Sequence, residues 1–505
     1  MESFLPLTSK RLAAIALLTL TYTIFGLNFF RQGKATSFGS LRLVRASLLE
    51  QQQQLLLPYP QHQPRQAIFR ANATKTPSSF ETLHVVTQDV RALLEGGGVY
   101  MYDTAALLAA VGAQPHLYRS RALNPGWVPT YDQYSIELTF IRLLQESSFL
   151  TQDPAKARLF IVPQYGLNEV HHCLFLEDRA LSPTLMDECR TNVTQEYLMP
   201  LLKAVQSGPW FQRHGGKDHL FVFPWDMAWR LFPGAPELLA NASYFGYYKD
   251  TDSAIIIPAP VPNSFSPAQT MRNLVQSGST LEHAAARLKH PVGSILDCEK
   301  LEEVSRWRKS DLDKEEWVWA PERTWLASFF GTVHPVRSYS MGIRQDLLAL
   351  LGEGRGLAHG IIFREGHVTS QRYEQAVAHS RFCLCPPGWT PWSQRLYSVI
   401  AGGCLPVFFE VPDFNMWRAF EDVVDWEAFS TVIPYGKHLD IVRLLRDIPP
   451  DRVCRMRAAL AHYAPLLSWS GTPDLPLMLA LREAWLRVSQ YLPTQPRNSP
   501  KSKIN

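Results

Sequence analysis

The sequence lacks the features that would assign it at once to a large functional class. It has no long basic run, no zinc-finger spacing and no internal repeat, and its net charge is only +4. A charge this small does not indicate a face that binds nucleic-acid phosphates. The composition, with 46% hydrophobic and 19% charged residues, is that of an ordinary globular protein. A length of 505 residues allows roughly two to four domains. The small net charge leads us to expect no nucleic-acid partner.

Cysteine is also scarce, with seven residues in the chain of 505. An odd number leaves at least one cysteine unpaired within the chain. The number is compatible with an oxidising compartment but does not require one. Cys383 and Cys385 are expected to point to opposite faces of one strand, so we expect no disulfide between them.

A long uncharged run lies near the N-terminus, from Leu12 to Phe30. It is about as long as a bilayer-spanning helix, which needs roughly 20 residues, and longer than the roughly 7–15-residue core of a signal peptide. We interpret residues 1–11 as a short cytosolic tail, 12–30 as a transmembrane signal anchor and 31–80 as a flexible stem. A cleaved signal peptide is the alternative.

The distribution of Lys and Arg does not show which end of this anchor faces the cytosol, because basic residues flank the run on both sides. They are Lys10, Arg11, Arg31, Lys34, Arg42 and Arg45. Three Asn-x-Ser/Thr glycosylation acceptors, at Asn72, Asn192 and Asn241, favour a lumenal body instead.

Apolar strand-like runs alternate with helix-like patterns from about residue 95 onward, which predicts parallel sheets covered by helices. We expect a first α/β domain over 95–320, with exposed helices in its last 60 residues, a second over 321–450, and C-terminal helices with a tail over 451–505. Two such domains favour a ligand cleft between them. Strands are expected at 99–102, 157–163, 219–224, 254–258, 326–331, 360–363, 382–385 and 404–409. Helices are expected at 134–150, 195–205, 340–351, 370–379 with Ser370 as the N-cap, and 393–401.

The most informative stretch is "RFCLCPPGWTPWSQRLYSVIAGGCLPVFFE", residues 381–410. It predicts a strand, a turn, a helix and a second strand, which is a βαβ unit. Ser393 suits the N-cap of the helix, Arg395 falls in its first turn, and Gly402-Gly403 ends it. Because a helix N-terminus offers free N–H groups and partial positive charge, an arginine there favours phosphate binding. Gly388 would let the backbone approach such a ligand.

Alternatives remain at this turn. An arginine at an exposed helix start can simply be solvated. Trp389 and Trp392 either stack on a base or sugar, or pack the loop against its own domain.

The same stretch resembles a known family. "FCLCPPG", Ser393 with Arg395, and "GCLPVFF" are similar to the signature of the exostosin-like glycosyltransferases, family 47. Further similar stretches occur in the family's order between about residues 98 and 445. They are "FLTQDPAKARLFIVP", "GGKDHLFVFPWD", "FFG" followed by Arg344, and "VVDWEAFSTVIP".

The resemblance implies a GT-B fold, with two Rossmann-like domains facing across a cleft. It implies inverting transfer from a nucleotide-sugar, usually a UDP-sugar, to a polysaccharide or protein-linked glycan. It also implies a single-pass type II Golgi protein with a lumenal body, no metal and no cofactor beyond the sugar donor. A complex with another glycosyltransferase is compatible with this picture.

The resemblance also suggests site residues. The donor would be bound in the second domain by Gly331, Arg344, Gly388, Ser393, Arg395 and Ser398. Asp226 is the candidate catalytic base, with His171 and His172 as weaker alternatives.

Two positions depart from the family pattern. Ser398 occupies a place where many members have glutamate, and Trp225 precedes Asp226 where many have histidine. These changes leave, as the first alternative, a non-catalytic member that binds glycan or supports a partner transferase. A glycoside hydrolase is the second, although no pair of carboxylates is nominated for that chemistry.

Overall fold

The computed structural model describes residues 90, 91, 94, 98–112, 133–176, 183–225, 228–249, 251–261, 323, 325–366, 368–388, 390–412, 417–469 and 474–491. The predicted anchor and stem, Asn72, Asp226, Trp389 and the helices expected within 262–320 lie outside these residues. Within them, no helix combines the length and apolar character needed to cross a membrane. The chain divides into two compact units, and the unit formed by Gln61–Asp178 and Asp187–Asn505 contains both sheets described below.

The first sheet has five parallel strands in the sequential order β1-β2-β3-β4-β5. The strands are β1 (Val99–Met101), β2 (Leu159–Ile161), β3 (His219–Val222), β4 (Ser243–Gly246) and β5 (Ala254–Ile256). Every residue of β2 to β5 is buried, as expected for strands of a parallel sheet that helices cover. The helices of this region are α4 (Thr104–Ala110), α6 (Ile136–Glu146), α7 (Gly166–Leu176), α8 (Pro183–Asn192), α9 (Met199–Ser207), α10 (Pro209–His214) and α11 (Ala235–Leu238).

The second sheet is also parallel and has the order β10-β9-β8-β6-β7. Its strands are β6 (Trp325–Gly331), β7 (Ile361–Glu365), β8 (Ser380–Leu384), β9 (Leu405–Phe409) and β10 (Thr431–Ile433). The chain passes from β6 to β7 on one side and then returns to β8 on the other. The strand order therefore reverses between β6 and β8, which is where open α/β sheets bind ligands.

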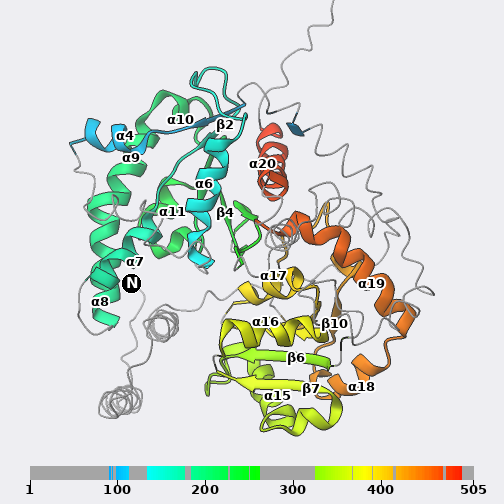
Figure 1. The fold of residues 1–505 in the computed structure, drawn as a ribbon. Helices are drawn as coiled ribbons and strands as arrows, with labels where there is room; N and C mark the ends of the chain where they lie inside the picture. The colour runs from blue at the N-terminus through cyan, green and yellow to red at the C-terminus, as the bar shows by residue number, and fades with distance from the viewer. Residues whose placement is uncertain are drawn as a thin grey trace, which may run out of the picture. The chain divides into compact units, whose positions relative to one another are not determined.

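The helices that follow these strands are α15 (Ile343–Leu351), α16 (Ser370–Ala378), α17 (Gln394–Ala401), α18 (Ile441–Arg446) and α19 (Pro450–Tyr463). The last helix, α20 (Asp474–Ser489), packs against α6, β2 and β5 of the first sheet region (Figure 1). Arg487 of this helix donates to the Ala254 carbonyl at 3.0 Å. The predicted C-terminal helices are therefore present, and the final one completes the covering of the first sheet.

Several local predictions need correction. The helix expected from Ser340 begins at Ile343, because Ser340, Met341 and Gly342 have positive φ values of 58°, 50° and 81°. The N-cap of α16 is Thr369 and not Ser370, because the Thr369 hydroxyl accepts from the Arg372 N–H at 3.4 Å. The strands β4 and β10 were not predicted, and the segment expected as a helix from 195 begins inside a π-helical stretch, Val193–Leu198.

Two disulfides join pairs of described residues, and Cys454 is also disulfide-bonded. Cys173–Cys189 joins α7 to α8, and Cys383–Cys404 joins β8 to the residue before β9. Cys385 is buried and carries a free thiol. The predictions that Cys383 and Cys385 do not pair with each other, and that at least one cysteine stays free, are confirmed.

The Cys383–Cys404 bond is expected to stabilise the unit that carries α17. It closes a loop of 21 residues, and constraining such a loop in the unfolded chain contributes roughly 3 kcal/mol. The double variant Cys383→Ser/Cys404→Ser should therefore unfold at a lower denaturant concentration by about that free energy. Cys385→Ala is the matched control and should lose much less. Equal losses in the two variants would show that burial of sulfur, and not the cross-link, is what matters.

Candidate functional site

The candidate site lies where the second sheet reverses its strand order. Two helices begin there with an arginine in the first turn: α15, after β6, has Arg344, and α17, after β8, has Arg395. Both side chains lie at the ring of Phe329, with guanidinium carbons 5.5 Å and 4.5 Å from its centre. The topology therefore brings two cations and two helix N-termini to one edge of the sheet.

Arg395 is hydrogen-bonded to the protein through only part of its guanidinium group. Ser393 is the N-cap as predicted, and its hydroxyl accepts from the Arg395 backbone N–H at 3.3 Å. The Arg395 Nη2 donates to the Phe330 carbonyl at 2.6 Å. Its Nε and Nη1 are buried and have no hydrogen-bond partner among the described residues. Leaving a buried donor unsatisfied costs about 1–3 kcal/mol, so these two atoms are placed for an acceptor that a ligand would bring.

Arg344 is 4% exposed and is fixed by carbonyl groups from two loops. Its Nη1 donates to the Thr332 carbonyl at 2.9 Å and to the Tyr339 hydroxyl at 2.5 Å. Its Nη2 donates to the Pro386 carbonyl at 3.1 Å. Arg344 therefore joins the loop after β6 to the Pro-Pro-Gly turn after β8.

The two predicted glycines lie at these arginines. A Cβ on Gly331 would be 2.1 Å from the Arg395 Nη2, so only glycine leaves room for the guanidinium there. A Cβ on Gly388 would be 3.5 Å from the Arg344 Nη2, an ordinary contact. Gly331 is therefore needed to make room for Arg395, and no such constraint exists at Gly388. Whether either glycine lets the backbone approach a bound donor stays a prediction.

The backbone before α15 is strained in a way that holds the site together. Ser340 is fully buried and adopts the left-handed conformation, which costs roughly 1–2 kcal/mol for a residue with a side chain. In this position its N–H donates to the Gly388 carbonyl at 2.9 Å, and its hydroxyl accepts from the Arg344 N–H at 3.1 Å. The strain therefore ties the turn after β8 to the start of α15.

The groups packed near Arg395 bring no negative charge. Burial raises the pKa of the Cys385 thiol to about 12, and it also raises the pKa of Tyr373 to about 12. Both groups therefore stay neutral near pH 7 and bring no negative charge to Arg395. The guanidinium charge of Arg395 is therefore available to an external anion.

Ser398 is less available than predicted. Its side chain is 5% exposed, and its hydroxyl donates to the Gln394 carbonyl of its own helix at 3.3 Å. Only its lone pairs remain for a ribose hydroxyl. Trp392 lies 4.5 Å from the ring of Tyr247, so part of its surface is used in protein packing.

On the first sheet, the structure brings some of the predicted acceptor-side residues together at the ends of β2 and β3. Trp225 is 4% exposed and lies 4.6 Å from the ring of Tyr134 and 5.9 Å from that of His171. Asp226 and the side chain of His172 lie outside the described residues. His171 is thus placed beside the residue that precedes the predicted base.

A buried carboxyl that the sequence did not single out lies at the same edge. Glu137 is fully buried on α6 and accepts from the N–H groups of Gln164 and Tyr165 at 2.8 and 3.0 Å. The Gln164 amide bridges it to the Val222 carbonyl at the end of β3. Burial raises the pKa of Glu137 to about 8. The available signal was a single glutamate within the apolar pattern "YSIELTFI".

The Asp218-His219 motif has a different place. His219 begins β3 and is fully buried, with Nε2 2.9 Å from the Tyr102 hydroxyl and Nδ1 2.8 Å from Asp218. Arg213 donates to the other Asp218 oxygen at 2.9 Å. This network lies at the amino end of the strand, opposite the edge where parallel sheets bind ligands. Its contacts fit a structural role.

No metal ligand set is found within the described residues, where no group of three acidic, histidine or cysteine side chains converges. The sequence holds two Asp-x-Asp triplets, at 250–252 and 311–313. Of their four aspartates the structure describes Asp252, whose side chain is 93% exposed.

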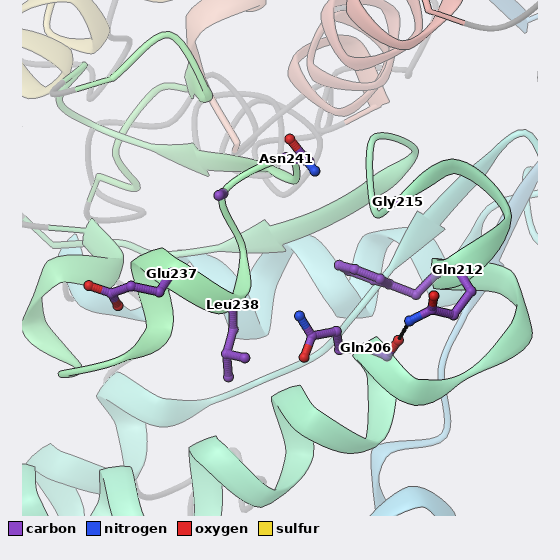
Figure 2. A pocket seen from close by; sticks show the side chains of 8 residues that line it. Gln206, Gln212, Gly215, Glu237, Leu238 and Asn241 are labelled. Carbon is purple, nitrogen blue, oxygen red and sulfur yellow. Dashed lines mark hydrogen bonds between the residues drawn. The ribbon is translucent and has the colours of Figure 1, made fainter.

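A pocket of about 220 Å³ lies on the first sheet region and not at the two arginines. Figure 2 shows it between the end of α9, α10 and α11, with Gln206, Gln212, Glu237, Leu238 and Asn241 around it. These elements lead into the amino ends of β3 and β4. The pocket is therefore separate from the candidate donor site.

Comparison with known proteins gives the family. The Exostosin GT47 domain matches residues 93–276 and 303–448, which is more than half of the chain. The chain therefore belongs to the exostosin GT47 family of glycosyltransferases. The resemblance drawn from the sequence motifs is confirmed.

Three plant relatives illustrate the match. A probable glycosyltransferase of Arabidopsis thaliana is 23% identical over 341 residues, which is 64% of this chain and 57% of that protein. A probable glucuronosyltransferase of Oryza sativa subsp. japonica is 33% identical over 65% of this chain and 68% of its own length. A probable glucuronoxylan glucuronosyltransferase of Arabidopsis thaliana is 23% identical over 72% of this chain and 70% of its own length.

Among solved structures, WaaG, a glycosyltransferase involved in lipopolysaccharide biosynthesis, aligns with 77% of this chain and 98% of its own. The identity is 12% and the TM-score is 0.23, so this alignment supports no conclusion about the present chain.

Gly331→Ala tests the geometry of the site. The added methyl group would collide with Nη2 of Arg395 and displace the guanidinium from the Phe330 carbonyl. Because a charge-assisted hydrogen bond contributes about 1.5–3 kcal/mol, we expect UDP affinity, measured by titration calorimetry, to fall about tenfold or more. Gly388→Ala is the control and should leave the affinity within about twofold. Equal UDP affinities for wild type and Gly331→Ala would contradict a role of Arg395 in binding.

Proposed function

We propose that this protein transfers a sugar from a UDP-sugar, with inversion, to a polysaccharide or a protein-linked glycan. The observation that carries the proposal is the pair Arg344 and Arg395 at the strand-order reversal of the second sheet, where buried donors of Arg395 lack a partner among the described residues. A diphosphate suits such a site, because its oxygens can accept from planar N–H donors and from helix N-termini together.

The leaving group of such a reaction is a nucleoside diphosphate, whose negative charge increases as the glycosidic bond breaks. Arg395 would donate from Nε and Nη1 to this charge. Arg344, already held by three acceptors, would contribute mainly its positive field. Groups fixed before the reaction stabilise a developing charge without reorganising. In this proposal, the two arginines and the helix N-termini stabilise the charge without a metal ion.

The acceptor would be activated from the first sheet. A general base must take the proton of the attacking hydroxyl. Asp226 is our candidate, and it directly follows the well-packed Trp225. His171 is the alternative, because its ring lies at the same cluster. Attack from the face opposite the diphosphate would give inversion. The Glu137–Gln164 contacts would keep the loop that leads into α7 in place.

The wider setting is also a proposal. Two parallel α/β domains support a GT-B arrangement. Disulfides at Cys173–Cys189 and Cys383–Cys404 fit an oxidising lumen. With the uncharged run from Leu12 to Phe30 and the acceptors Asn192 and Asn241, they favour a type II Golgi protein whose body is lumenal.

The names of the relatives suggest donors to test first. Relatives are named as glucuronosyltransferases and as β-1,4-xylosyltransferases. We therefore propose UDP-glucuronate and UDP-xylose as the first candidates. The non-catalytic alternative rests on Ser398, whose hydroxyl hydrogen is committed to its own helix.

The test is a donor assay with wild type and two variants of Arg395. We expect the purified full-length protein to hydrolyse or transfer from at least one UDP-sugar. Arg395→Ala should weaken UDP-sugar binding about tenfold or more, since a charge-assisted donor contributes about 1.5–3 kcal/mol. Arg395→Lys should restore only part of this affinity, because lysine keeps the positive charge but lacks the planar guanidinium group that donates two parallel hydrogen bonds.

The outcomes separate the two readings. Binding of UDP-sugar without turnover by wild type would favour the non-catalytic member. Equal affinity in wild type and Arg395→Ala would show that the diphosphate does not bind at this edge.

A further inference from the structure

The pocket on the first sheet region is lined by a glycosylation acceptor. Asn241, of the triplet Asn241-Ala242-Ser243, is exposed and lies at its rim (Figure 2). The pocket lies at the amino side of the sheet, away from the arginines of the candidate site. Neither the donor site nor the acceptor-side cluster uses it.

The atom that would be modified lies against the pocket wall. Gly215, the residue after α10, also lines the pocket. A Cβ built on Gly215 would be 3.8 Å from the Asn241 Nδ2. Since an N-linked sugar is bonded to this nitrogen, its first ring would start at the pocket.

The lining has the chemistry of a site for one sugar ring. Phe211 and Leu238 supply apolar surface, and Gln206, Gln212 and Glu237 supply polar groups. The Gln212 Nε2 donates to the Gln206 carbonyl at 2.7 Å, which fixes that side chain beside the pocket. Sites for small molecules combine apolar walls with a few placed polar groups, and drug-sized ligands need about 300–1,000 Å³. A volume of about 220 Å³ suits a single ring instead.

We propose that Asn241 carries an N-linked glycan and that its innermost N-acetylglucosamine packs in this pocket. The inference rests on the lumenal orientation proposed above. In the transfer, a bond forms between Nδ2 and the anomeric carbon of a lipid-diphosphate-linked oligosaccharide. The bond from that carbon to the diphosphate breaks, the diphosphate leaves, and Nδ2 loses one proton. Ser243 is 4% exposed within β4, so the transfer precedes insertion of this strand into the sheet.

The experiment uses the full chain expressed through a secretory pathway. Mass spectrometry of glycopeptides gives the occupancy of Asn241 and of Asn192, which lies exposed at the end of α8. Folded protein is then treated with peptide N-glycosidase, and release is followed at each site. We expect Asn241 to be occupied and its glycan to be released about tenfold more slowly than that of Asn192, the factor that about 1.4 kcal/mol of packing gives. Release from denatured protein should be equally fast at both.

The variant Gln212→Ala/Glu237→Ala removes polar lining and leaves the acceptor triplet intact. Occupancy of Asn241 should stay unchanged, while release from the folded protein should accelerate to the rate of the denatured chain. Protease protection in sealed microsomes reports the orientation independently.

The three possible failures are distinguishable. An unmodified Asn241 in a protease-protected chain would overturn the proposed modification. An occupied Asn241 released equally fast from folded and denatured protein would overturn the packing. An unprotected, unmodified chain would refute the lumenal orientation, and this inference with it.

Discussion

The structure of the candidate site depends on one constraint, which is the burial of two guanidinium groups at the end of a parallel sheet. Taking a cation out of water is costly unless hydrogen bonds and opposite charge replace its hydration. Backbone carbonyls of Phe330, Thr332 and Pro386 satisfy part of this need. Three local features accommodate these two side chains. The left-handed turn at Ser340 places its hydroxyl on the Arg344 N–H. Ser393 caps the helix that carries Arg395, and Gly331 leaves room for the Arg395 guanidinium. The remainder of the cost would be offset by an anionic ligand.

The two sheets differ in a way that fits two substrates. The second sheet reverses its strand order between β6 and β8, and this reversal separates the following helices so that both N-termini face one edge. The described strands of the first sheet run in sequential order without a reversal. At its carboxyl edge lie the rings of Trp225, Tyr134 and His171, and not a pair of buried cations. Fixed positive charge suits a diphosphate donor, and an aromatic cluster suits the apolar faces of a sugar acceptor.

The sequence predicted those features that local physics determines. Long buried runs such as "LFIVP" and "CLPVFF" gave strands, and the N-cap at Ser393 followed from the residue types around it. The strand β4 was missed because its apolar run is only Tyr244-Phe245, between Ser243 and Gly246. The start of α15 was missed because the contacts of Ser340 with Gly388 and Arg344 override its helical pattern. The role of Glu137 depends on its contacts with Gln164 and Tyr165, which are distant in the sequence, and no local pattern encodes such contacts. The hydroxyl of Ser398 donates within its own helix, to the Gln394 carbonyl.

The most direct test of this account is an experimental structure of the protein with UDP bound. We predict that diphosphate oxygens lie within about 3.2 Å of the Nε and Nη1 atoms of Arg395, at the N-terminus of α17 and on the side of Phe329. A diphosphate bound elsewhere, with these two nitrogen atoms still unpaired, would contradict the central claim that this arginine pair forms the donor site.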